Sequence, residues 1–379
     1  MSGTTLLCLM TLCNTFCLGA FGPLLPEIAR TNQLADWQLG VVAGAFGFAR
    51  MAAALPTGWL AGRYLGSMLA ASPVLLTAGL LLLGGAGSFL VLVLGRLLMG
   101  LAHTLGTVGG LTALLQDNRG PGGSMRLNTF EFAAMIGVLG GLGLVGMLPA
   151  WLGWNVSLVI ASSPLVLVLA LIPALRHRFP DTPARRFDAS RQPTAHRLER
   201  APPVVWMMFA IGVVLALAWS SVSQFLIPVR GTREFGLERS GVSGMLMLAQ
   251  AVDLVALLPV GRLADRLGRV PVIGTVVLVM GLGTVAVGLG SLPWFMAGCA
   301  GFGLGMAAWM LPLGVIRDHT RLEVFAWRTG LYRVGVDSAT FLGPIGSGLL
   351  GEHGAGPFVA VVGIAAIVLG TRLLWAAGH

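Results

Sequence analysis

Long apolar runs alternate with short polar breaks along the whole chain. A helix needs roughly 20 apolar residues to cross a bilayer. Twelve runs approach or exceed this length. They predict transmembrane helices at 5–27, 37–61, 68–86, 88–114, 126–150, 155–175, 202–228, 241–262, 270–290, 292–316, 326–350 and 356–376. The pattern therefore predicts an all-α polytopic membrane protein.

One long polar stretch divides these runs into two sets of six. It begins at Arg176, carries seven arginines and is rich in proline, so it cannot build a packed domain. We predict an N-terminal six-helix bundle at 1–175, a cytoplasmic linker at 176–201 and a C-terminal bundle at 202–379. The arginines are expected to meet anionic lipid headgroups. Nucleic-acid binding is the weaker interpretation, because aromatic residues are sparse among them.

The two predicted bundles are related by an internal repeat with an offset of 203 residues. The matching segments are Gly58–Arg63 with Gly261–Arg266, Gly95 and Gly100 with Gly298 and Gly303, and Gly140–Gly143 with Gly343–Gly346. Matches in the same order and at the same spacing indicate two pseudo-symmetric halves. Such halves around a central cavity are typical of transporters that work by alternating access.

Composition and charge agree with a membrane protein and give its orientation. Hydrophobic residues make up 56% of the chain and charged residues 10%, whereas soluble domains carry about 25% charged residues. This excludes a soluble enzyme and a disordered chain. Loops on the linker side hold seventeen arginines, and the opposite loops hold four. The positive-inside rule then predicts a plasma (inner) membrane protein with both termini in the cytoplasm.

The loop between the eighth and ninth predicted helices carries a known pattern. The residues that carry it are Gly261, Asp265, Arg266 and Arg269, in the spacing G-x-x-x-D-R-x-G-R. It resembles the signature of the major facilitator superfamily. In the corresponding segment of the first half, Gly58–Arg63, Gly62 stands at the position that Asp265 takes in the second half. The resemblance covers the span count, the linker and the repeat as well. It implies a twelve-span transporter.

Two shorter patterns resemble the drug:proton antiporters of that family. Arg96 and Gly100 match the R-x-x-x-G feature of their fourth helix. Gly343-Pro344-Ile-Gly346 keeps the antiporter signature, whereas its mate at Gly140–Gly143 lacks the proline. The resemblance thus favours antiport.

The loop signature suggests a conformational latch. The resemblance places Asp265 opposite the start of the fifth helix, Gly122–Arg126, where Ser124 is a candidate N-cap. An acid is stabilised beside a helix N-terminus. We expect Asp265 to engage this start when the cytoplasmic gate is shut. The alternative is that Asp265 pairs with neighbouring arginines.

Ionisable residues inside predicted spans are rare and are candidates for function. They are Arg50, Arg96, His103, Glu131, Asp253, Arg333 and Asp337. The resemblance places the second and eleventh helices side by side, which predicts a gating pair between Arg50 and Asp337. The alternative partner for Asp337 is Arg333, one helical turn earlier.

A carboxyl removed from water is a candidate carrier for the coupling proton. We favour Asp253 over Glu131, because Asp253 lies deeper. Glu131 can instead pair with Arg126 or reach the inner surface. His103 can relay protons, bind substrate or simply pack, and Arg96 is expected to face the cavity.

The cavity is expected to be lined by the first, fourth, seventh and tenth helices. Candidate lining residues are Asn14, Trp219, Ser223, Gln224 and Trp309. Aromatic rings with a few polar groups suit an amphiphilic organic solute, although the same residues also pack helices.

The sequence favours a secondary active transporter, with proton-coupled export of small amphiphilic molecules as the leading hypothesis. No motif of a soluble enzyme occurs, and no cofactor is expected. The four cysteines are interpreted as packing residues, with a metal site as the weaker alternative. Expected partners are a small solute, protons and the lipid bilayer, and the protein is expected to be a monomer. Alternatives are uptake of an organic anion, and a receptor or scaffold without flux.

Overall fold

The computed structural model describes residues 2–116, 123–181 and 201–377, in which helices are joined by short turns and no strand occurs. We call residues 2–181 the N-terminal portion and residues 201–377 the C-terminal portion. The helices of the N-terminal portion are α1 (Gly3–Gly19), α2 (Phe21–Thr31), α3 (Asp36–Ala61), α4 (Leu65–Gly84), α5 (Phe89–Gln116), α6 (Gly123–Met147), a 3₁₀ turn (Ala150–Leu152), α7 (Gly153–Ala161) and α8 (Pro164–Arg178). Those of the C-terminal portion are α9 (Pro203–Ser221), a π-helical turn (Val222–Leu226), α10 (Ile227–Arg233), α11 (Arg239–Leu267), α12 (Arg269–Leu289), α13 (Leu292–Met306), α14 (Leu311–Asp318) and α15 (Leu322–Ala377).

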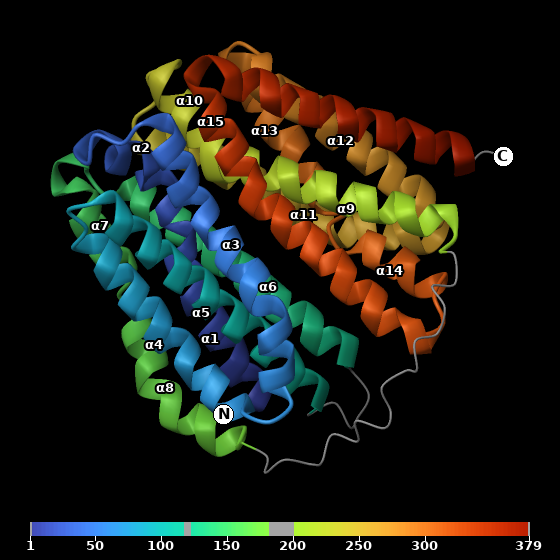
Figure 1. The fold of residues 1–379 in the computed structure, drawn as a ribbon, viewed down its shortest axis with the longest axis horizontal. Coiled ribbons are helices and arrows are strands. Elements are labelled where there is room, and N and C mark those ends of the chain that lie inside the picture. Colours follow the sequence, from blue (N-terminus) through green and yellow to red (C-terminus); the bar gives the residue numbers. More distant parts are fainter. Residues whose placement is uncertain (1, 117–122, 182–200, 378–379) are drawn as a thin grey trace.

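Eleven helical segments among the described residues are long and apolar enough to cross a membrane. The last of them, Trp327–Ala376, has 50 residues and is too long for one crossing, because such a helix extends about 75 Å. It breaks at Gly351, where φ is 67° and ψ is −168°. Glycine tolerates this backbone conformation because it has no Cβ. Figure 1 shows α15 folding back on itself.

Four predicted helices that read as continuous apolar runs are broken in the structure. The breaks lie at Ala20, at Ser162–Ser163, over Val222–Leu226 and over Ala307–Met310. Each break ends one to three residues before a proline, namely Pro23, Pro164, Pro228 and Pro312. Proline has no N–H to donate to the carbonyl four residues earlier, and its ring clashes with that carbonyl. Hydropathy does not register this backbone effect, so it did not predict that the spans 5–27, 155–175, 202–228 and 292–316 are each interrupted.

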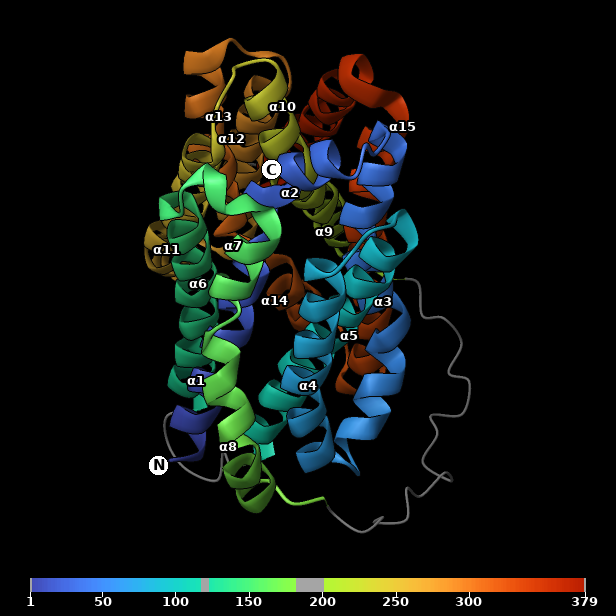
Figure 2. The ribbon, with the colours of Figure 1, turned by 90° about the vertical axis from the view of Figure 1, so that its left-hand side faces the viewer.

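The two portions meet along two pairs of helices, α3 with α15 and α6 with α11. These are the neighbours that the family resemblance implies. In Figure 1 the blue-to-green helices and the yellow-to-red helices approach each other near α2 and α10. They diverge toward the opposite end, where the N-terminus lies, and we call this the linker end. Figure 2 shows α2 and α10 together at the other end, where they are in contact.

The two portions approach each other closely where glycines of α3 and α15 face each other. A Cβ added to Gly40 of α3 would lie 2.6 Å from the carbonyl oxygen of Pro344 and 2.9 Å from Cα of Gly348 in α15. Small residues let two helices pack backbone to backbone in a membrane protein. The fit between α3 and α15 near the α2–α10 end therefore requires glycine on both sides.

Asp181, just after α8, connects this helix to the start of α4. Its carboxylate accepts hydrogen bonds from the Ser67 backbone N–H at 3.0 Å and from the Ser67 hydroxyl. Partial burial raises the pKa of Asp181, but the hydrogen bonds from Ser67 and Gly66 and the charge of Arg176 lower it by more, so it lies below its usual value. The carboxylate thus caps α4 and fixes the point where the chain leaves the N-terminal portion.

Candidate functional site

A cavity of about 200 Å³ lies between the two portions, near the middle of the helices. Its polar and ionisable wall residues come from both portions and are Thr15, Arg50, Arg96, His103, Ser223, Gln224, Gln250 and Asp253. Aromatic and apolar side chains complete the wall, among them Phe46, Trp219, Phe302 and Met306. The arrangement suits a solute that has both an apolar body and a polar group.

Three of the five candidate cavity residues lie on this wall, namely Trp219, Ser223 and Gln224. Asn14 is placed elsewhere, because its amide nitrogen donates to Ser72 Oγ at 3.1 Å and joins α1 to α4. Trp309 is not on the wall either, and its ring centroid lies 6.4 Å from that of Trp219.

Arg50 and Asp337 form an ion pair between α3 and α15. Arg50 Nη2 lies 2.9 Å from Asp337 Oδ1, and the side chains are 15% and 3% exposed. The predicted contact between them is therefore present. Arg333, the alternative partner, makes no ion pair with any residue that the structure describes. Arg50 also reaches the cavity wall, so the pair joins the cavity to the contact between the two portions.

Arg96 of α5 is 2% exposed and reaches the cavity wall, as expected. Its guanidinium carbon lies 3.8 Å from the ring centroid of Phe21 and 5.0 Å from that of Phe46. Its nitrogens donate to the carbonyls of Val42 and Ala43 and to Gln224 Oε1, each at 3.4 Å. Aromatic faces and neutral oxygens therefore hold this cation.

Asp253 of α11 faces the same cavity and accepts a hydrogen bond from Gln250 Nε2 at 3.1 Å. This is its only polar contact with the described residues. Glu131 lies half-buried on α6, the neighbouring helix, but is not on the cavity wall. His103 is on the wall, with its ring 5.5 Å from that of Phe46.

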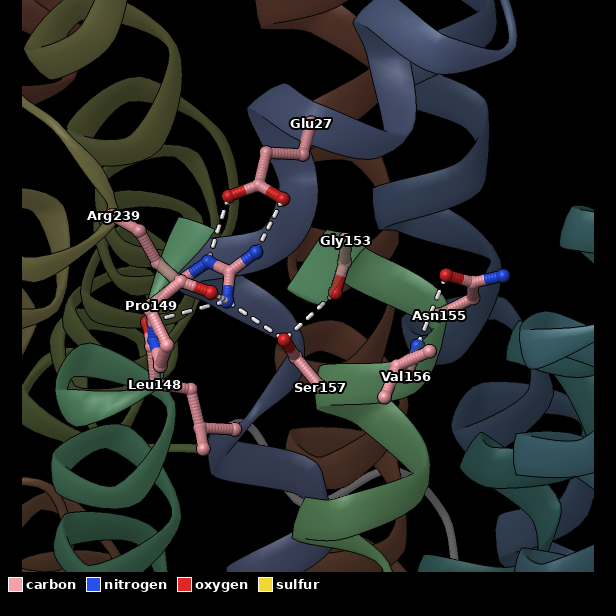
Figure 3. A network of polar contacts seen from close by, with 8 residues as sticks. All are labelled: Glu27, Leu148, Pro149, Gly153, Asn155, Val156, Ser157 and Arg239. Atoms are coloured by element: carbon pink, nitrogen blue, oxygen red, sulfur yellow. Dashed lines mark hydrogen bonds and ion pairs between the residues drawn. The ribbon is translucent and has the colours of Figure 1, made fainter. Parts of the chain in front are cut away.

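The α2–α10 end is held by a buried arginine that crosses between the portions (Figure 3). Arg239 of α11 donates to both carboxylate oxygens of Glu27 in α2, at 2.7 and 2.6 Å. It also donates to Ser157 Oγ at 2.7 Å and to the carbonyls of Leu148 and Pro149. The Arg239 side chain is 2% exposed. Bidentate pairs of this kind are strong and geometrically specific, and we call Glu27, Ser157 and Arg239 the end lock.

A second cross-portion contact lies at the same end. Arg233 Nη1 of α10 lies 2.7 Å from Asp36 Oδ1 at the start of α3, and 3.8 Å from Glu352. Together with the end lock and the contact of Gly40 with Gly348, it closes the α2–α10 end of the molecule.

The loop signature lies at the linker end, between α11 and α12. Arg269 pairs with Asp318, whereas Asp265 and Arg266 are exposed. Gly261 is on α11, and a Cβ added to it would meet nothing within 4 Å. The expected latch partner falls outside the described residues, because Gly122 and the side chains of residues 123–125 are not described.

Sequence comparison adds the family to this geometry. The family model of the Major Facilitator Superfamily matches residues 7–252 and 226–378. The chain belongs to the Major Facilitator Superfamily. This membership supports a secondary transporter rather than an enzyme, and with the apolar helices it indicates a multi-pass membrane protein.

Individual relatives of this superfamily member are distant. An uncharacterized MFS-type transporter of Enterobacter sp. (strain 638) is 24% identical over 392 residues, covering 98% of this chain and 96% of the relative. A crystal structure of a mutant of the nucleoside transporter NupG has a TM-score of 0.77 at 14% identity, covering 99% of this chain and 100% of that one. A POT family transporter in complex with a thioalcohol-conjugated peptide has a TM-score of 0.81 at 12% identity, covering 99% and 96%. At these identities the structural likeness shows the fold alone.

Two features of the site were not predicted for this superfamily member. Gln250 is a polar residue at helical spacing from Asp253, and that spacing is the signal that points to it. The end lock has no comparable signal, because Glu27 and Arg239 lie 212 residues apart and both sit near predicted loops.

Proposed function

We propose that this protein exports small amphiphilic organic molecules in exchange for protons, by alternating access. In this proposal α15 provides two spans, so twelve spans form six-helix bundles at 1–175 and 202–379 around the linker at 176–201. Both termini lie in the cytoplasm, the protein resides in the plasma (inner) membrane, and it acts as a monomer without a cofactor.

The observation that carries the proposal is the cavity between the portions, with Asp253 on its wall. A carboxyl here meets both the solute and the moving helices, and its only polar contact with the described residues is with the neutral Gln250. Such an acid can take and release one proton per cycle without a fixed cation to hold it ionised. We assign Asp253 the coupling proton, with Glu131 and His103 as auxiliary carriers.

Charged pairs between the portions serve as gates in this proposal. The end lock and the Arg233–Asp36 pair hold the α2–α10 end closed, so the cavity opens toward the linker end. The Arg50–Asp337 pair, with Arg333 nearby on α15, senses the relative position of α3 and α15. The Asp265 latch, with Gly261, Arg266 and Arg269 in its loop, closes the linker end in the opposite state.

Export is favoured by the resemblance of Arg96–Gly100 and Gly343–Gly346 to antiporter signatures. Uptake of an organic anion is the second candidate, and the observation in its favour is the charge of Arg96, which no carboxylate among the described residues neutralises. The sign of the pH change that accompanies solute flux separates the two candidates.

Reconstituted protein tests the proposal. Wild-type protein and the Asp253→Asn variant are placed in liposomes, and flux of neutral, cationic and anionic amphiphilic dyes is measured with and without an imposed pH gradient. We expect the gradient to drive dye flux in the wild type, and the variant to lose this dependence because its amide cannot carry a proton. Glu238→Gln, an exposed acid at the α2–α10 end, is the matched control and is expected to keep it.

Other outcomes are also informative. An Asp253→Asn variant whose flux still follows the pH gradient would remove Asp253 from the coupling mechanism. Absence of any dye flux in the wild type would favour a receptor or scaffold that keeps the transporter fold.

A further inference from the structure

Arg96 differs from three other arginines whose side chains are at most 15% exposed. Arg50, Arg230 and Arg239 each have a carboxylate within 3 Å. Arg96 is 2% exposed and has no carboxylate within 4 Å among the described residues. An arginine buried in a membrane protein without a counter-charge is energetically costly and marks a functional position.

The hydrogen bonds that Arg96 makes are long. All three are 3.4 Å, whereas N–H···O bonds are most often about 2.9–3.0 Å. A guanidinium carries five N–H donors. Nη1 donates to no described residue, so part of the donor fork is left for another acceptor. A carboxylate or phosphate accepts two such bonds in parallel.

Gln224 supplies a second unused donor beside it. Its Oε1 accepts from Arg96, and its amide Nε2 donates to no described residue. Gln224 lies on the cavity wall, in the π-helical turn Val222–Leu226. The turn arises because Pro228 cannot donate to the Gln224 carbonyl, and π-helical turns occur often at functional sites.

The surroundings favour an anion with an apolar body. The charges of Arg50 and Asp337 offset each other, and Asp253 is neutral when it carries a proton. In that state the positive charge of Arg96 on the cavity wall is not offset by either carboxyl group. Trp219, Phe302 and Met306 provide apolar wall in the same cavity.

We propose that Arg96 and Gln224 form an anion-binding subsite, which takes the carboxylate or phosphate group of a small organic solute. The two residues come from α5 and from the π-helical turn, so a bound anion bridges the N-terminal and C-terminal portions. Solute binding is thereby coupled to the position of the two portions. The inference rests on the transport function proposed above, whose substrate class it narrows.

Matched probes test the subsite in purified full-length protein in detergent at neutral pH. Benzoate and phenylphosphonate carry the two anionic groups, and benzamide and benzylamine are neutral and cationic analogues with the same ring. Thermal stabilisation is measured against probe concentration. We expect at least one of the anions to stabilise the protein in a saturable way, and the neutral and cationic analogues to have no such effect. The anion that binds more tightly identifies the preferred group.

Variants locate the binding. Arg96→Gln and Gln224→Leu are expected to weaken anion binding at least about tenfold, because each removes a hydrogen bond to a charged group. Arg96→Lys keeps the charge without the planar fork and should bind with intermediate affinity. Arg30→Gln, which changes an exposed arginine away from the cavity, is the control and should bind as the wild type does. If Arg96→Gln does not fold, Gln224→Leu decides.

Three results would overturn the subsite: equal binding of benzamide or benzylamine, no stabilisation by either anion, or unchanged anion binding in Gln224→Leu. The transport proposal fails separately. Proton-driven flux of a cationic dye without anion binding would remove the subsite alone, whereas anion binding without flux of any solute would remove the transport function.

Discussion

The ion pair of Arg50 with Asp337 is a single contact that joins the cavity to the boundary between the portions. Because both side chains are largely buried, each charge depends on the other for compensation. The neighbouring Arg333 makes no ion pair with a described residue. Loss of either partner would therefore leave an uncompensated charge at the contact between α3 and α15.

Removing one partner should cost more than removing both. Asp337→Asn leaves the Arg50 charge buried and unpaired, for which losses of about 3–5 kcal/mol are typical. The double variant Arg50→Gln/Asp337→Asn should recover part of this loss, as measured by thermal unfolding in detergent. The exposed Arg269–Asp318 pair is the control, and its removal should cost about 0–1 kcal/mol. A double Arg50/Asp337 variant as unstable as the sum of the two single variants would contradict the pairing.

The same pair shows what the sequence could predict at this scale. Arg50 and Asp337 stood out because charges inside apolar runs are rare, and the family resemblance supplied the neighbouring helices. Asn14 lies away from the cavity wall in the structure, and the sequence could not indicate this because an apolar run does not reveal which helix face meets the cavity. Glu27 and Arg239 gave no signal, because charges near predicted loops are common.

The sequence predicted the helical class and the order of the apolar helices, but it did not predict where those helices are interrupted. Hydropathy averages over side chains, whereas the breaks before Pro164, Pro228 and Pro312 arise from a missing backbone N–H. Proline alone does not decide a break, because α3, α4 and α11 continue through Pro56, Pro73 and Pro259. Gln224 lies in one such interruption, so a feature that hydropathy cannot see helps to shape the cavity.

The contact between α3 and α15 depends on the absence of side chains at Gly40 and Gly348. Gly40→Val should force the helices apart at the α2–α10 end, because its Cβ would lie 2.6 Å from the Pro344 carbonyl oxygen. Pulsed EPR between spin labels at Trp37→Cys and Leu350→Cys, in a background without the native cysteines, measures the separation. Gly58→Val is the control, since a Cβ there meets nothing within 4 Å. An unchanged distance in Gly40→Val would show that the helices do not pack in this way.

The connection of α8 to α4 through Asp181 should depend on pH. Its folded pKa lies below the unfolded value of about 3.9, so the stabilisation is present above that pH and is lost as the pH falls through the folded pKa. At neutral pH, Asp181→Asn should increase hydrogen exchange at residues 65–68 and 175–181. Glu238→Gln should leave that exchange unchanged. Equal exchange in Asp181→Asn and the wild type would show that the cap is not formed.

At the scale of the whole molecule, the two portions touch at one end and diverge at the other. The end lock, the Arg233–Asp36 pair and the glycine contact all lie at the α2–α10 end. In a transporter that alternates, these contacts must break when the cavity opens on that side. Breaking the end lock would leave the buried Arg239 without its carboxylate, which is costly.

Accessibility of the cavity from each side of the bilayer tests alternating access most directly. Ser223→Cys, on the cavity wall, is combined with Glu27→Cys and Arg239→Cys in a background without the native cysteines. Before the Ser223→Cys site is labelled, the two cysteines introduced at the end lock are treated in one of two ways. They are either cross-linked to each other by a short bifunctional thiol reagent (bridged protein) or each blocked by a monofunctional one (capped protein). An impermeant thiol reagent is then applied to one side of oriented vesicles at a time. We predict that capped protein is labelled from both sides and bridged protein only from the linker side. Labelling from one side only in the capped protein, or from both sides after bridging, would contradict alternating access.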